Sequence, residues 1–116
     1  MEMRVIKNKI PRSTLKDLAL KQFGNMVKAV VDVKQGIMAI GGELHADEEV
    51  LLSEQEGSGR DDTWGINLYP DESGEKFIEF DSMVNIKPAL GNRSRDVLNA
   101  ETRKKIRAIV QELIIL

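Results

Sequence analysis

MVKAVVDVKQGIMAIGGELHADEEVLL, residues 26–52, is the stretch of this sequence that decides the fold. Residues 27–33 alternate between two faces and are rich in β-branched side chains, which predicts a strand. Residues 34–36 then read as a tight turn with Gly36 at the position that needs a positive φ, so residues 37–40 return as an antiparallel partner. We therefore expect the sheet of this protein to be built around this hairpin.

The end of this stretch, residues 46–55, fits two structures. Its acidic residues ahead of Val50 suit the first turn of a short helix, where carboxylates interact favourably with the helix dipole. The same residues suit a strand that runs into a turn at residues 56–59. We expect the strand, because another strand follows closely.

Further along the chain, alternating apolar and polar residues predict more strands. Residues 64–69 alternate until Pro70, and residues 77–87 carry the cleanest alternation in the chain. Residues 3–6 can add a short edge strand. The strands are separated by short turns, which favours antiparallel pairing.

Two other stretches repeat apolar residues at helical spacing. The first lies between Ser13, placed as an N-cap, and Gly24, which suits the left-handed position that ends a helix. The second follows Asn99, which can cap it. The two apolar stripes consist of Leu15, Leu18, Ala19 and Phe23, and of Ile106, Ile109, Val110, Leu113 and Ile114.

These elements predict an α+β fold in which residues 1–116 form a single domain. We expect an antiparallel β-meander of about five strands, with the N-terminal and the C-terminal amphipathic helix packed on one face. The opposite face of the sheet is then expected to be wet.

The composition limits the classes of function. A net charge of −2 and a pI near 5.5 predict no general attraction to nucleic acid or to acidic membranes. The absence of cysteine excludes thiolate metal sites and cysteine nucleophiles. No apolar run approaches the roughly 20 residues of a membrane span, and no apolar segment typical of a signal peptide follows the N-terminus. We therefore expect a cytoplasmic protein.

Glu43, His45 and Asp47 are the first candidate site. They lie at i, i+2 and i+4, a spacing at which strand side chains share one face, roughly 6–7 Å apart. An imidazole and two carboxylates can bind zinc or another divalent metal, and Asp81 or Glu79 could then act as a catalytic base. The alternative is a solvated histidine beside surface carboxylates, because the chain has no second histidine.

The polar face of the sheet is the second candidate. Clustered carboxylates can shift one another's pKa for acid–base chemistry, or can bind Mg²⁺ or Ca²⁺. The alternative is an ordinary wet face of an antiparallel sheet. The residues assigned to this face are Lys28, Asp32, Asn67, Glu79, Asp81 and Asn85.

The loop that contains Asn92, Arg93 and Arg95 is the third candidate. Two arginines among small polar residues, ahead of a helix N-terminus, can bind a phosphate or a carboxylate. The alternative is that the arginines pair with local acids such as Asp96 and fasten the loop.

Apolar residues that the alternation leaves on the wet face indicate a protein contact. They are Val30, Met38, Phe77 and Met83. The chain also ends in four apolar residues, 113–116. A monomer would expose part of this surface, so we expect a homodimer.

Four phrases together resemble one family: AVVDVKQGIMAIGGELHADEEVLL, WGINLYP, FIEFDSMVNIKP and GNRSR. The family consists of small bacterial proteins described only as a domain of unknown function. The resemblance covers nearly the whole chain from about Leu15 onward. It implies a stand-alone single-domain protein, and it implies no activity, substrate, cofactor or site residue.

Besides a purely structural subunit of a larger assembly, two functions remain open from the sequence, and so does the question whether the chain is an enzyme. The first is a self-associating binding module that recognises an anionic small molecule or a protein partner near Arg93 and Arg95. The second is a metal-assisted hydrolase in which Glu43, His45 and Asp47 hold a divalent metal cofactor.

Overall fold

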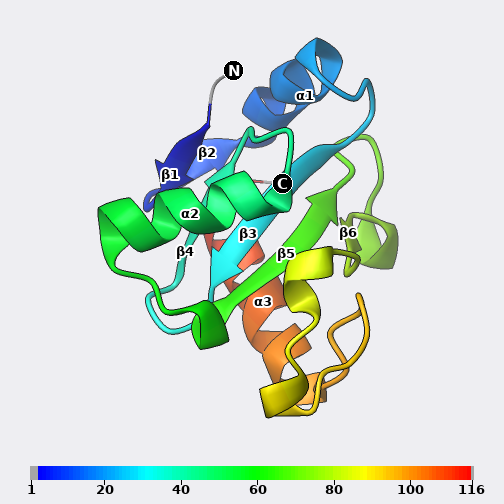
Figure 1. Cartoon of the computed structure of the whole chain (residues 1–116). Coiled ribbons are helices and arrows are strands. Elements are labelled where there is room, and N and C mark those ends of the chain that lie inside the picture. Colours follow the sequence, from blue (N-terminus) through cyan, green and yellow to red (C-terminus); the bar gives the residue numbers. More distant parts are fainter. Residues whose placement is uncertain (1–2, 116) are drawn as a thin grey trace.

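The structure is a computed structural model and describes residues 3–115. Five antiparallel strands form the main sheet in the order β1-β4-β3-β5-β6 (Figure 1). Their bounds are Arg4–Ile6 for β1, Val27–Asp32 for β3, Ile37–Ile40 for β4, Thr63–Leu68 for β5 and Ile78–Glu79 for β6. Strands β2 (Ile10–Pro11) and β7 (Ile114–Ile115) pair in parallel as a second, small sheet. The predicted hairpin is present, and β3 is the central strand of the main sheet.

Helices cover both faces of the sheet (Figure 1). Helices α1 (Arg12–Lys21) and α3 (Ala100–Leu113) pack on one face and form the main core with β3, β4 and β5. Helix α2 (His45–Glu56) packs on the other face over β3 and β4. The α+β fold, with an antiparallel sheet and both terminal helices on one face, is confirmed. Short 3₁₀ helices complete the chain at Arg60–Asp62 (η1), Gly74–Lys76 (η2), Met83–Asn85 (η3) and Pro88–Leu90 (η4).

The strand expected at residues 46–55 is wrong, because these residues lie in α2. Glu48 and Leu52, four residues apart, are buried, whereas Val50 between them is exposed; a strand would place all three on one face, and a helix does not. Leu52 packs with Val30 and Ala39, which means that this face of the sheet is covered and not wet.

The long strand expected over residues 77–87 is also wrong. Pairing with β5 stops after Glu79, and the chain turns into η3, where the hydroxyl of Ser82 accepts a hydrogen bond from the N–H of Val84. Serine favours such local bonds to the backbone over a strand ladder. The apolar–polar alternation therefore continued past the point at which the strand ends.

Asn85 replaces the missing strand at the edge of β5. Its amide oxygen accepts from the N–H of Gly65 (2.7 Å), and its amide nitrogen donates to the carbonyl of Gly65 (2.9 Å) and to the carbonyl of Arg95 (2.9 Å). The close approach of the segment at Ser82 to β5 requires glycine at position 65, because a Cβ at Gly65 would lie 2.5 Å from the Cβ of Ser82.

The helix ends agree with the sequence in part. Helix α1 begins at Arg12 with Pro11 at the N-cap position, so the expected cap at Ser13 is wrong. The helix ends as predicted before Gly24, which has a φ of 90° and donates its N–H to the carbonyl of Ala19. Asn99 caps α3 as predicted and accepts a hydrogen bond from the N–H of Thr102 (2.9 Å).

The apolar residues assigned to the wet face are mostly inside. Val30, Met38 and Phe77 are buried, and only Met83 is exposed. At the chain end Leu113 and Ile114 are buried and Ile115 is exposed, whereas Leu116 lies outside the described residues. Between residues 3 and 115, no helix is long and apolar enough to cross a membrane.

Replacement of Gly65 by alanine tests the close approach to η3. The new methyl group would overlap Ser82 and Val84, so we expect Gly65→Ala to lower the free energy of unfolding by about 1–3 kcal/mol. Urea unfolding followed by circular dichroism measures this. Gly59→Ala is the control, because Gly59 is exposed and has a negative φ. Equal, small effects of the two substitutions would contradict the packing argument.

Candidate functional site

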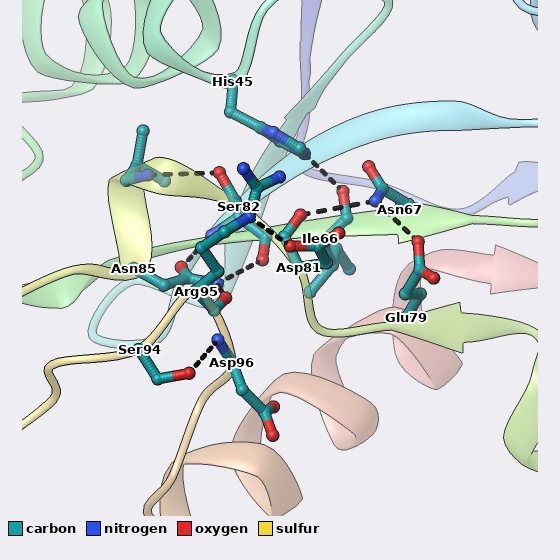
Figure 2. Close-up of polar contacts among 12 residues, drawn as sticks. His45, Ile66, Asn67, Glu79, Asp81, Ser82, Asn85, Ser94, Arg95 and Asp96 are labelled. Carbon is teal, nitrogen blue, oxygen red and sulfur yellow. Dashed lines mark hydrogen bonds and ion pairs between the residues drawn. The ribbon is translucent and has the colours of Figure 1, made fainter.

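Residues from all three sequence candidates meet at one place in the structure (Figure 2). We define the His45 cluster as His45 from the start of α2, Asn67 from β5, Glu79 from β6, and Asp81 and Arg95 from the irregular segment that follows. Hydrogen bonds and charge interactions connect these five side chains. The cluster lies on the α2 side of the sheet, at the start of that helix.

His45 is held as a neutral imidazole with a defined tautomer. Its Nε2 lies 2.8 Å from the carbonyl oxygen of Ile66. Because a carbonyl only accepts hydrogen bonds, Nε2 carries the proton and Nδ1 keeps its lone pair. Burial lowers the pKa of His45 below its usual 6.5, and the nearby charge of Lys28 lowers it further. The Ile66 carbonyl, Asn67 and Asp81 act in the opposite direction but do not reverse the shift.

Asn67 contains a buried amide oxygen that makes no hydrogen bond of normal geometry within residues 3–115, although its interaction with the His45 ring raises the pKa of His45. Its amide nitrogen donates to Glu79 Oε1 (2.8 Å) and more weakly to the carbonyl of Asp81 (3.3 Å). Figure 2 shows this amide beside the Ile66 carbonyl that His45 binds. This oxygen is an acceptor that a well-placed donor on a ligand could satisfy, since a buried polar atom without a good hydrogen bond costs free energy.

Glu79 is bound by two donors. The hydroxyl of Tyr69 also donates to Glu79 Oε1 (2.9 Å). Burial raises the pKa of Tyr69 to about 12, with a further contribution from the hydrogen bond and charge of Glu79. Tyr69 therefore stays protonated at neutral pH and acts as a donor that orients Glu79.

Arg95 and Asp81 form the exposed edge of the cluster. Arg95 Nε lies 2.6 Å from Asp81 Oδ1, and the two side chains are 55% and 44% exposed. An ion pair so open to water contributes little to stability. Only the Nε–H of the guanidinium is used in this pair, so the N–H groups on both Nη atoms are not needed for it.

The rest of the arginine loop has a structural role. Asn92 is buried, and its amide nitrogen donates to the carbonyls of Asn85, Ser94 and Asp96 while its oxygen accepts from the N–H of Leu98. The hydrogen bonds of the Asn92 amide therefore fix the conformation of the loop. Asp96 pairs with Arg103 (2.8 Å) rather than with the loop arginines, and Arg93 is exposed.

The strand geometry assumed for the metal candidate is absent. His45 and Asp47 belong to the first turn of α2, and Glu43 lies in the bend before it. Side chains two residues apart on a helix do not share a face. The part of the chain that the structure describes contains no group of three His, Asp or Glu side chains that could hold a metal ion.

Two other members of the predicted polar face are structural. Asp32 is buried at the start of the hairpin turn and accepts hydrogen bonds from the hydroxyl of Ser58 and from the backbone N–H groups of Lys34 and Gln35. Burial raises the pKa of Asp32, but these bonds outweigh it, so the net pKa is lowered. Asn85 completes the edge of β5, as described above.

Two buried ionisable side chains, Glu48 and Lys87, are not among the candidates that the sequence indicates. Glu48 accepts from the N–H of Gly42 through Oε2 (3.0 Å), and burial raises its pKa well above 4.5. Lys87 donates to the carbonyl of Val84 (3.0 Å), and burial lowers its pKa despite Glu49 nearby. No local pattern indicates either burial, because acids early in a helix and lysines in a strand are usually exposed.

Comparison with known proteins gives a family and no function. Residues 4–113 match the model of a family described as "Protein of unknown function (DUF5674)". No curated protein and no solved structure matches the chain. The match confirms the resemblance inferred from the sequence, and it assigns no residue a role.

Titration of His45 tests the geometry of the cluster. It is the only histidine, so its ring signals in an NMR titration need no assignment. We expect a midpoint below 6.5 in the folded protein, and a still lower one in Asn67→Ala, because Asn67 raises the pKa of His45. The folded state then binds this proton more weakly than the unfolded state, and stability falls as the pH drops from 6.5 through the folded midpoint. The urea-unfolded chain is the control and should titrate near 6.5. A folded midpoint at or above 6.5 would exclude the buried, neutral imidazole.

Proposed function

This chain belongs to the DUF5674 family, whose description assigns no activity, and we propose that it is a binding protein for a small polar molecule with an anionic group. The observation that supports this proposal is the buried Asn67 amide oxygen, which makes no hydrogen bond of normal geometry within residues 3–115 and belongs to the same cluster as the exposed Arg95 guanidinium. The ligand would bind at the His45 cluster.

The acceptors in the cluster call for hydrogen-bond donors on the ligand. Asn67 Oδ1 and the carboxylate of Glu79 can accept, and His45 Nδ1 keeps a lone pair. A hydroxyl or ammonium group on the ligand fits these acceptors.

The arginine loop is suited to bind an anionic group of the ligand. Arg95 uses Nε for Asp81 and can present its Nη groups to a carboxylate or phosphate in the bidentate manner typical of arginine. Arg93 lies exposed two residues away on a loop that Asn92 holds in shape. A ligand that carries a donor group next to an anion therefore matches both halves of the cluster.

Binding fits these residues better than metal-assisted hydrolysis. The two candidate bases are engaged, since Glu79 accepts from Asn67 and Tyr69 while Asp81 pairs with Arg95. Across residues 3–115 no three-ligand metal group supports a Lewis-acid centre.

Thermal unfolding with small anionic probes tests the proposal. We would use phosphoserine, glycerol 3-phosphate, tartrate and inorganic phosphate. A probe at one hundred times its dissociation constant should stabilise the protein by about 2.7 kcal/mol, a shift of several degrees in Tm. Arg95→Gln and Asn67→Ala should each remove the shift.

Arg60→Gln is the matched control, because Arg60 is also an exposed arginine in an ion pair, here with Glu49 (3.6 Å). It should keep the shift. No stabilisation by any probe, or equal loss in the Arg60 and Arg95 variants, would overturn the proposal.

We further propose that the chain forms a homodimer through the hollow between α1 and the start of α2. Phe23 and Leu44 line this hollow and are both exposed, and exposed apolar patches often mark protein contacts. Light scattering at micromolar concentrations should give twice the chain mass, and Leu44→Ser should shift it toward the monomer. A monomeric mass for the unmodified chain throughout this range would exclude the dimer.

A further inference from the structure

Another hollow lies on the side of the sheet opposite the His45 cluster. It is bordered by α1, the loop that leads into β6, and α3. It has a volume of about 470 Å³, and its lining includes Arg12, Phe77, Arg107 and Val110. These segments are far apart in the sequence, but α1 and α3 share one face of the sheet (Figure 1). The volume falls within the range of about 300–1,000 Å³ that is typical of small-molecule sites.

Arg12 builds one wall of the hollow. Its Nε donates to the carbonyl of Pro70 (2.6 Å), and its Nη2 donates to the carbonyl of Glu72. These bonds fasten the loop to the start of α1 and hold the guanidinium 4.9 Å from the centre of the Phe77 ring. They use two of the five guanidinium N–H groups, so Arg12 retains donors and its full charge.

Arg107 supplies a second positive charge that no carboxylate neutralises in residues 3–115. It lies 5.1 Å from the centre of the Phe80 ring. Arg103 lies at the same distance from that ring, but it makes a two-pronged ion pair with Asp96 (2.8 Å to each oxygen). Both arginines therefore lie near the Phe80 ring, but only the charge of Arg103 is neutralised by a carboxylate. Of the two, only Arg107 lines the hollow.

The floor of the hollow is apolar. Phe77 and Val110 are buried there, and Ile78 is partly buried. Flat apolar groups stack well on such a floor and beside guanidinium planes. The charged lining consists of Arg12, Arg107 and the carboxylate of Glu75, so one positive charge is left over. One remaining positive charge is neutralised by the single negative charge of a carboxylate. A phosphate with two negative charges would leave the site with a net negative charge.

We propose that this hollow binds a planar aromatic carboxylate, with the ring against Phe77 and Ile78 and the carboxylate between Arg12 and Arg107. This site is separate from the His45 cluster, and it takes a flat apolar anion instead of a hydroxylated one.

Titration calorimetry with 2-naphthoate tests the site. Arg107→Gln should weaken binding roughly tenfold or more, the usual effect of losing one charged hydrogen-bond partner. Lys104→Gln removes the same charge from an exposed position of α3 outside the hollow, and should change binding by less than about twofold. Arg95→Gln, which impairs the His45 cluster, should leave naphthoate binding unchanged.

Two further measurements separate charge from shape. Ser73→Phe keeps both arginines and places a ring in the hollow, so it should abolish binding; circular dichroism confirms that the variant folds. The neutral analogue 2-naphthalenemethanol should bind at least roughly tenfold more weakly than 2-naphthoate. Undetectable naphthoate binding, unchanged binding in Arg107→Gln or Ser73→Phe, or equal binding of the neutral analogue would each overturn the proposal. Tight binding of naphthyl phosphate in place of 2-naphthoate would overturn the choice of a carboxylate.

Discussion

The paired hydrogen bonds between the Asn85 amide and Gly65 are the constraint on which the half of the structure that contains the His45 cluster depends. Strand β6 pairs with β5 over only two residues, so the backbone of Gly65 at the edge needs another partner. The amide of Asn85 supplies both a donor and an acceptor, and glycine allows η3 to come close enough. The same amide binds the carbonyl of Arg95 and thereby places that arginine beside Asp81.

Helix α2 has a comparable effect on the other half of the His45 cluster. By covering β3 and β4 it turns an expected wet face into a second apolar core, and its first turn brings His45 onto the Ile66 carbonyl. The same packing encloses Glu48, and burial raises the pKa of its carboxyl group well above the usual value because burial disfavours the charged form. The helix thus converts ordinary surface residues into groups with shifted pKa values.

The two proposed ligand sites use opposite sides of the sheet and opposite kinds of surface. The His45 cluster is polar, with acceptors at its centre and an arginine at its edge. The hollow beside Arg107 is apolar at its floor and positively charged at its walls. In both places an arginine, Arg95 or Arg12, uses some of its guanidinium N–H groups to bind the protein. Its remaining N–H groups are the donors proposed for the ligand. The two proposed sites would therefore take two chemically different anions without overlap.

The sequence by itself determined the central hairpin, the two terminal helices, the cap at Asn99 and the α+β class, because these features depend on residues close together in the chain. Periodicity, turn glycines and capping side chains act over a few residues. Only the tertiary structure decided that residues 46–55 are a helix, that β6 ends at Glu79, and that His45, Asn67 and Arg95 meet. The physical reason is that each of these outcomes is set by a distant partner: Val30 for Leu52, Gly65 for Asn85, and Ile66 for His45.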